Sequence, residues 1–293
     1  MRHRFAVSIL MLVLGAGLLA AAAGGNGSPA RGSGAILEFS LFAGIENIDP
    51  QRSFYLPEWQ YEWLTARMLV TFAHEPGALG YRLVNDGARS YTISRDGRTY
   101  TFHLRPGMKL SDGSRLAAPN YKRALLRVLS PDVDSRIASL LTDPATASIV
   151  GAADYNAGRT SAVPGIKTRG PYTLVITLDS PSPVLLTLLA LPPTGAVAMT
   201  MPFAPITSVS PRNPLPSGGR YYVQEYIPDR SLRIRKNRFY RPLGAPPTPA
   251  RADGFDYDIG VQQDQAYLLI KNEQLDWAAD GLPPSVWSGI FGR

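Results

Sequence analysis

Two tight turns, a strand and the approach to a helix follow one another between Asp96 and Ser114, and this order leaves few folds open. Tyr100, Phe102 and Leu104 alternate with more polar residues, which is the period of a half-buried β-strand. One Asp-Gly pair before the strand and another after it supply the turns. We therefore expect a β-hairpin whose second strand leads towards a helix.

Helical spacing follows this stretch. The apolar residues Tyr121, Leu125, Val128 and Leu129 recur at the intervals that place side chains on one face of a helix. Pro119 falls in the first turn, where proline is tolerated because an amide hydrogen would have no partner there. The pattern predicts an amphipathic helix.

Alternation of apolar and polar residues predicts further strands. The segments with this pattern are 35–42, 166–168, 172–178, 221–226, 231–236 and 255–261. The strands 221–226 and 231–236 are expected to form a hairpin. Between them and the earlier elements, the proline-rich stretch 202–216 shows neither period and is predicted to be a surface connector.

Helical spacing also predicts three more helices. One carries Trp59 and Trp63, whose rings we expect to pack in the core rather than to bind a ligand. A short helix is expected over 184–191. The third is expected to be capped by Asp264 and to run to about Gln274.

The composition excludes some classes of protein. With 293 residues, of which 45% are hydrophobic, the chain can bury a core, so it is not a disordered protein. The net charge is +7, but the basic residues are scattered along the sequence rather than clustered. We therefore expect no binding to nucleic acid.

No motif supports catalysis. Cysteine is absent, which removes disulfides, thiolate metal ligands and cysteine nucleophiles. His103 lies on a predicted strand, where a structural role is expected. The sequence Ser-Asp-Gly at 111–113 lacks the partner motifs of penicillin-recognising enzymes, and Asp256 and Asp258 fit a strand better than a calcium loop. We expect no enzyme activity, no metal and no cofactor.

The N-terminus has the composition of an export signal. Basic residues at positions 2–4 precede an apolar run from Phe5 to Ala23. Small residues at the end of this run suit cleavage, although the run also nearly has the length that spans a bilayer. Residues 1–23 are predicted to be a cleaved signal peptide, with an uncleaved anchor as the alternative, and residues 24–34 a flexible linker. Without cysteine, no lipoprotein anchor can form.

The motif D-G-x-x-Y-T-F-x-L-R-P-G-x-K-x-S-D-G occupies residues 96–113 and, with the helix after it, resembles the extracytoplasmic solute-binding proteins of family 5. This family holds the oligopeptide-, dipeptide- and nickel-binding proteins that serve ABC importers. Weaker matches are G-A-x-x-Y-x-x-G at 151–158 and L-x-S-P-S-P at 178–183. The resemblance runs from about Ala35 to Trp277, and it departs at 217–221, where S-G-G-R-Y replaces the family's G-T-G-P-Y.

The resemblance implies an α/β fold, a lobe of the type II periplasmic-binding-protein kind with an extra α+β subdomain. Residues 35–293 are then the N-terminal part of a solute-binding protein. Within this part, residues 35–58 and 192–293 are expected to form the first lobe and residues 59–191 the inserted subdomain. Members of the family also have a second lobe, which we expect to be missing here.

The function implied by the resemblance is that of the substrate-binding component of an ABC importer. Such a protein binds a peptide or a similar small solute in the cleft between its lobes and delivers it to a membrane permease, without catalysis. We expect an exported monomer, in the periplasm or on the outer face of the cytoplasmic membrane. The second hypothesis is a truncated exported remnant or a split half, which acts as a structural or interaction protein without binding solute by itself.

Four residues are candidates for ligand contact under this resemblance. Glu46 and Asn47 leave the first strand where relatives approach the cleft, and Tyr55 is an aromatic residue in the loop that follows. Asp280 lies near the expected hinge, where a carboxylate can meet a cationic group on the ligand. The alternative for all four is that they cap turns or face solvent.

Overall fold

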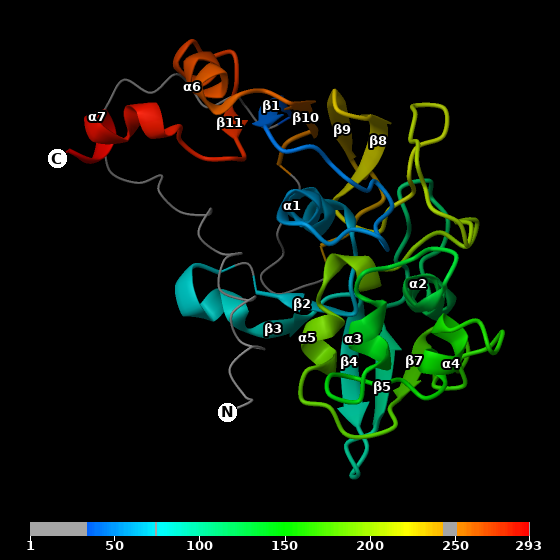
Figure 1. The fold of residues 1–293 in the computed structure, drawn as a ribbon. Coiled ribbons are helices and arrows are strands. Elements are labelled where there is room, and N and C mark those ends of the chain that lie inside the picture. Colours follow the sequence, from blue (N-terminus) through cyan, green and yellow to red (C-terminus); the bar gives the residue numbers. More distant parts are fainter. Residues whose placement is uncertain (1–33, 74, 243–250, 293) are drawn as a thin grey trace.

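The computed structural model describes residues 34–73, 75–242 and 251–292, and Figure 1 shows their arrangement. Two sheets dominate the fold. One combines strands from both ends of the described chain, and the other is built from strands of its middle part. Helix α1 (Leu56–Thr65) lies between the two sheets in this view and packs against strand β8 and the 3₁₀ helix η3.

The larger sheet has five strands in the order β11-β1-β10-β9-β8. In that order, their bounds are Trp277–Ala278, Ile36–Leu41, Gly254–Ile259, Ser231–Lys236 and Tyr221–Ile227. β1 runs parallel to both β10 and β11, whereas β9 is antiparallel to β10 and to β8. The predicted first strand and the predicted hairpin are confirmed, and β1 is placed between two strands from the far end of the chain.

The second sheet has four antiparallel strands in the order β4-β5-β7-β6. In that order, their bounds are Ala88–Ile93, Thr99–Leu104, Thr173–Thr177 and Ile166–Thr168. The predicted hairpin is confirmed, because β4 pairs with β5 and Gly97 in the turn between them has a φ of +70°, which glycine adopts without strain. Tyr100, Phe102 and Leu104 are buried, as their alternation predicts.

A ribbon of two strands and several short helices complete the structure. The ribbon pairs β2 (Val70–Phe72) with β3 (Leu83–Asn85). The remaining α-helices are α2 (Ala118–Leu129), α3 (Ala138–Thr142), α4 (Ala152–Asn156), α5 (Leu185–Leu188), α6 (Gln263–Lys271) and α7 (Trp287–Phe291). The 3₁₀ helices are η2 (Gly77–Tyr81), η3 (Pro192–Thr194) and η4 (Pro284–Val286).

Helix α2 is the helix predicted from apolar spacing. Tyr121, Leu125, Val128 and Leu129 are all buried, and they belong to the same hydrophobic cluster as Phe102 of β5. The helix therefore covers the four-stranded sheet with the face that its sequence pattern defines.

Two predicted helices differ from the structure. The helix expected over 184–191 is regular only over α5, because Ala190 and Leu191 donate to carbonyls three residues back before the prolines begin. Asp264 was expected to cap α6, but the residue at the N-cap is Gln262. The Asp264 carboxylate instead accepts a hydrogen bond from the hydroxyl of Ser285, which lies on η4.

A buried ion pair joins α2 to the chain that follows β1. Arg127 Nη2 donates to Asp49 Oδ2, and both side chains are completely enclosed (0% exposed). Arg127 Nε also donates to Gln51 Oε1 at 2.9 Å, and Ile206 N–H donates to Asp49 Oδ2 at 2.8 Å. Hydrogen bonds from several directions are what a buried charge needs in order to be tolerated. The segment around Asp49 is thereby fixed against α2.

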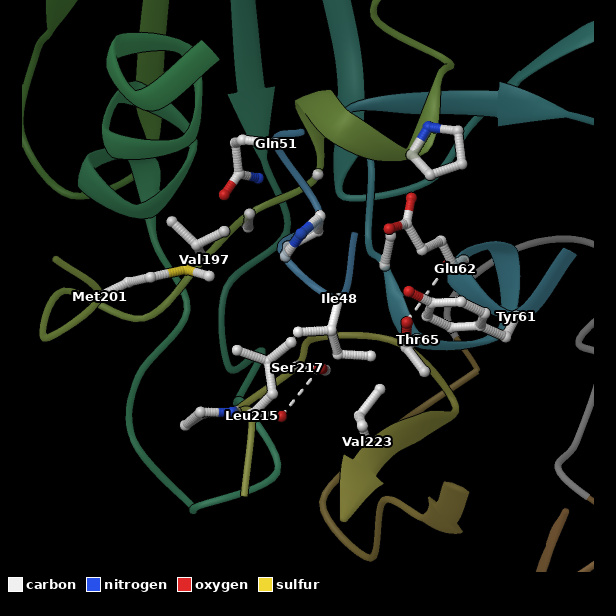
Figure 2. A pocket seen from close by; sticks show the side chains of 16 residues that line it. Ile48, Gln51, Tyr61, Glu62, Thr65, Val197, Met201, Leu215, Ser217 and Val223 are labelled. Atoms are coloured by element: carbon white, nitrogen blue, oxygen red, sulfur yellow. Dashed lines mark hydrogen bonds between the residues drawn. The ribbon is translucent and has the colours of Figure 1, made fainter. Parts of the chain in front are cut away.

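A small internal cavity lies where α1, η3 and β8 meet, as Figure 2 shows. Its volume is about 20 Å³, which is room for a single water molecule. Tyr61, Glu62, Val197 and Val223 are among the side chains that line it. A cavity of this size cannot hold a peptide.

Glu62 faces this cavity with a carboxyl group whose pKa is raised. Burial raises the pKa of Glu62 well above its usual range, and the charges of Glu58 and Asp49 add to the increase. Ser53 Oγ donates to Glu62 Oε2 at 2.6 Å and also lies 3.1 Å from Pro50 O. The shorter contact is the hydrogen bond that Ser53 donates to Glu62, and this bond partly offsets the effect of burial on the Glu62 pKa. The other oxygen, Oε1, has no protein partner.

The predicted signal peptide, residues 1–23, lies outside the described residues, as does the linker except for Gly34. Within the described residues, no helix combines the length and the apolar character that crossing a bilayer requires.

Replacing Asp49 with asparagine tests the buried ion pair. D49N keeps the shape of the side chain but leaves the guanidinium of Arg127 without a counter-charge, so the free energy of unfolding is expected to fall by about 3–5 kcal/mol. Urea denaturation measures this loss. D154N is the matched control, because Asp154 and Arg159 pair on the surface and losing such a pair costs about 1 kcal/mol or less. Similar losses in both variants would show that the buried pair is not a principal tie.

Replacing Glu62 with glutamine tests whether the pKa of this carboxyl is raised in the folded protein. Because the folded protein holds this proton to a higher pH than the unfolded chain, the contribution of Glu62 to stability is complete below the unfolded pKa of about 4.3 and is lost as pH rises through the raised folded pKa. Each pH unit in that window costs about 1.4 kcal/mol. E62Q removes the dependence, so it should be more stable than the wild type at pH 8 and lose that advantage towards pH 5.

The measurement is a series of urea denaturation curves from pH 5 to pH 8.5. E75Q serves as the control, because Glu75 lies at the surface beside Arg82 and its substitution should shift stability by about 0.5 kcal/mol or less at every pH. If the stability difference between E62Q and the wild type does not change with pH, the pKa of Glu62 is not raised in the folded protein.

Candidate ligand-binding site

The carboxyl ends of three parallel strands meet at one edge of the larger sheet. β10 and β11 flank β1, and all three run in the same direction. In open α/β sheets, ligands bind beyond the carboxyl ends of such strands. The chain leaves this edge through residues 42–47 after β1, 260–262 after β10 and 279–283 after β11. The candidate site is therefore built from these exits and from the segments that they lead to.

Asp280 ties two of these exits together. Its carboxylate accepts a hydrogen bond from Phe42 N–H, directly after β1. Ala279 N–H donates to Ser40 O at 3.0 Å, and Gln263 Nε2 donates to the backbone oxygen of Asp280 at 2.9 Å. Asp280 is half-buried, so its carboxylate supports the end of β1 and remains reachable at the sheet edge.

Glu58 shapes the segment between β1 and α1. Its Oε1 accepts from Asn47 N–H at 2.7 Å, and its Oε2 accepts from the N–H groups of Phe54 (2.7 Å) and Tyr55 (3.1 Å). Glu58 is the third residue of α1, the position from which a glutamate side chain reaches back to the start of its helix. Asn47 enters this arrangement through its backbone, since its carbonyl also accepts from the hydroxyl of Tyr61.

Arg136, just before α3, brings two of the predicted residues together. Its Nη2 donates to Glu46 Oε1 at 2.7 Å, and its Nη1 donates to the Tyr55 hydroxyl oxygen at 2.8 Å. The guanidinium carbon lies 5.1 Å from the centre of the Tyr55 ring, a cation–π distance. The negative charge of Glu46 raises the pKa of Arg136 further above its already high usual value, so the guanidinium is always charged. We call Glu46, Tyr55 and Arg136 the arginine cluster.

A row of aromatic rings continues from this cluster onto α1. Tyr55 meets Phe54 with ring centres 6.0 Å apart, Phe54 meets Trp59 at 6.2 Å, and Trp59 meets Trp63 at 6.1 Å, each pair nearly edge to face. The sequence predicted that Trp59 and Trp63 pack in the core, but both are half-buried in this row, while Phe54 and Tyr55 are exposed. The row gives the arginine cluster an apolar flank.

The structure separates the four predicted residues into different environments. Glu46 and Tyr55 meet at Arg136, Asn47 is held by its backbone, and Asp280 lies at the end of β1. Arg136 was not predicted from the sequence, since it lies 81 residues from Tyr55 and no local pattern marks it. Phe54 was also missed, although an aromatic residue directly before Tyr55 was a signal that could have found it.

The arginine cluster can bind a charged ligand without covalent chemistry. The side chains of Arg136 and Glu46 are 47% and 48% exposed, so water screens their attraction and the pair contributes little to stability. Each side chain can therefore leave this ion pair and bind an oppositely charged group of a ligand. The exposed rings of Phe54 and Tyr55 lie next to them. Among the described residues, no three His, Cys, Asp or Glu side chains lie close enough to hold a metal ion.

A family model for "Bacterial extracellular solute-binding proteins, family 5 Middle" matches residues 82–290. The "Probable deoxycholate-binding periplasmic protein YgiS" of Escherichia coli (strain K12) is 30% identical over 155 residues, which cover 53% of this chain and 28% of that relative. The "Dipeptide-binding protein" of Lactococcus lactis subsp. cremoris (strain MG1363) is 32% identical over 106 residues, 36% of this chain and 18% of the relative. The chain thus matches less than a third of the length of these two relatives.

Solved structures share the fold. The murein tripeptide binding protein MppA of Escherichia coli has a TM-score of 0.74 at 22% identity, and the match covers 88% of this chain and 48% of that one. The "Clavulanic acid biosynthesis oligopeptide binding protein 2" has a TM-score of 0.73 at 26% identity, covering 90% of this chain and 47% of that one. The described chain thus spans about half the length of these structures, and the predicted α/β fold is confirmed. Since the family model covers more than half of the chain, the protein belongs to the bacterial extracellular solute-binding proteins of family 5.

Proposed function

We propose that this chain is part of the substrate-binding component of an ABC importer, and that its ligand is a peptide or a similar small solute. The arginine cluster is the observation that supports this most directly, because it offers a carboxylate, a guanidinium and an aromatic ring at the surface of the segment that leaves β1. A peptide carries an amino and a carboxylate group that match these two charges. The names of the relatives, which bind dipeptides, oligopeptides and a murein tripeptide, agree with this class of ligand.

The proposal includes the organisation of the molecule. Residues 35–58 and 192–293 form a first lobe, and residues 59–191 form an inserted subdomain. Two observations support this division: the strands of the larger sheet come from 36–41 and 221–278, and those of the four-stranded sheet from 88–177. The chain acts outside the cytoplasm as a monomer, after export by residues 1–23, and delivers its ligand to a membrane permease without catalysis.

A second function rests on a different observation. Apolar side chains of the last elements are exposed, among them Leu268 on α6 (57%) and Trp287 on α7 (53%). Exposed apolar surface of this kind is typical of an interface. In this second proposal the chain is a split half or remnant that pairs with another polypeptide and binds no solute by itself.

Thermal unfolding with and without a mixture of short peptides distinguishes the two functions. A ligand that binds only the folded protein stabilises it by about 2.7 kcal/mol at 100 times its Kd, so the first function predicts a clear rise in Tm. A folded sample whose Tm does not respond to any peptide would rule out independent solute binding and favour the second function.

Glu46 is expected to contribute to affinity but not to stability. E46Q removes a carboxylate that can bind the amino group of a peptide, so the Kd should rise about tenfold, which corresponds to roughly 1.4 kcal/mol. The free energy of unfolding without peptide should change by about 1 kcal/mol or less, because the pair with Arg136 is a surface pair. Isothermal titration measures the Kd, and D154N, in another surface pair, is the control. If E46Q and D154N bind equally well, the arginine cluster is not the site.

Two substitutions of Asp280 separate a ligand contact from a structural tie. D280N keeps an acceptor for Phe42 N–H and removes the charge, so the predicted outcome is weaker binding of a cationic ligand with unchanged stability. D280A also removes the acceptor and should lower the free energy of unfolding by about 1 kcal/mol. Titration and urea denaturation measure the two effects. If D280N binds peptide as the wild type does, the role of Asp280 is structural.

A further inference from the structure

Cationic side chains and aromatic rings lie in a continuous row on the surface formed by the turn after β5 and the chain after β9. The members are Arg238, Phe239, Lys109, Arg115 and Tyr172, and we call them the cation–aromatic stripe. Lys109 and Arg115 are paired in an antiparallel bridge across the turn, so their side chains leave the same face. Residues that are far apart in the sequence thus form one surface.

Contacts with the rings fix the cations of the stripe. Lys109 Nζ lies 5.4 Å from the centre of the Phe239 ring, and the guanidinium carbon of Arg238 lies 4.8 Å from the same ring. Arg115 lies 4.9 Å from the centre of the Tyr172 ring and donates from Nη2 to its hydroxyl oxygen at 2.6 Å. The rings hold these cations in position without neutralising their charge.

Phe239 is held by the same turn. Gly113 has a φ of +86°, and a Cβ on it would lie only 3.1 Å from Phe239 Cζ. The turn therefore packs its glycine directly against the ring, and Lys109 is brought over that ring as well. The stripe is thus a built surface rather than a chance meeting of long side chains.

No carboxylate of the described residues forms an ion pair with the three cations. Lys109, Arg115 and Arg238 are exposed, and none forms an ion pair with a carboxylate among the described residues. The acid on this turn, Asp112, accepts instead from Ser114 N–H at 2.8 Å. The stripe thus places three exposed cations without a carboxylate ion-pair partner on one surface of the described chain.

We propose that the cation–aromatic stripe docks on anionic phospholipid headgroups at a membrane surface. Each exposed cation near an anionic bilayer gains favourable electrostatic energy, and aromatic rings suit the interface between headgroups and chains. The apolar run from Phe5 to Ala23 with its basic start is an export signal or anchor, so a membrane is the anionic surface that the chain meets. This surface is separate from the arginine cluster and does not depend on solute binding.

The test compares binding of the full chain to vesicles of phosphatidylglycerol and of phosphatidylcholine by co-sedimentation. Residues 5–23 can bind both kinds of vesicle. The ratio of the two affinities therefore isolates the electrostatic contribution to vesicle binding. The triple variant K109Q/R115Q/R238Q removes three charges of the stripe. The control R95Q/R212Q/R230Q removes three charges from exposed residues in other turns.

The wild type and the control are expected to prefer phosphatidylglycerol, and the preference should fall as salt screens the charges. The triple variant should lose about 100-fold of this preference, since each basic residue near the surface contributes about a factor of five. Far-UV circular dichroism and Tm confirm that both variants fold. An equal preference in the triple variant and the control would overturn the proposal. So would a wild type that binds a single-stranded oligonucleotide through these cations but does not bind the vesicles.

Discussion

The ion pair between Asp49 and Arg127 determines how the two sheets meet. Arg127 lies on α2, whose apolar face covers the four-stranded sheet, while Asp49 lies in the chain that leaves β1 of the larger sheet. A charged pair with no exposure is tolerated only when its remaining donors and acceptors are satisfied, and Gln51 and Ile206 provide those partners. Glu46 and Tyr55 flank Asp49 in sequence and bind Arg136, which lies between α2 and α3, so the candidate site depends on this junction.

Two glutamates one turn apart on α1 have opposite chemical roles. Glu58 accepts three backbone N–H groups and fixes the segment that carries Asn47 and Tyr55, a task for which a carboxylate is suited. Glu62 is enclosed next to a cavity, where burial raises its pKa and it accepts a hydrogen bond from the Ser53 hydroxyl. Two glutamates on one helix thus serve different purposes, because one reaches backbone N–H groups and the other is enclosed by the core.

The sequence predicts elements well and contacts poorly, for physical reasons. The strand at Tyr100–Leu104 and helix α2 follow from periods that are local, because neighbouring side chains must share a buried face. Likewise, a resemblance carried by turns and strands led to the correct fold. The arginine cluster follows from no such period: Arg136 reaches Glu46 across 90 residues, and only the tertiary structure shows that they meet. The same holds for Asp264, whose carboxylate is used by Ser285 instead of the helix that it was expected to cap.

The position of β1 between β10 and β11 has a consequence for how the chain folds. Glu38 on β1 donates its N–H to Asp276 Oδ2 at 2.8 Å, across a separation of 238 residues. Contacts between residues this far apart in sequence form late in folding. The chain loses entropy when it closes such a long loop, and this loss precedes the stabilisation that the contact provides. The hairpin of β4 and β5 forms instead from neighbouring residues. During synthesis from the N-terminus, β1 therefore stays without its sheet partners until β10 and β11 have been made, more than 200 residues later.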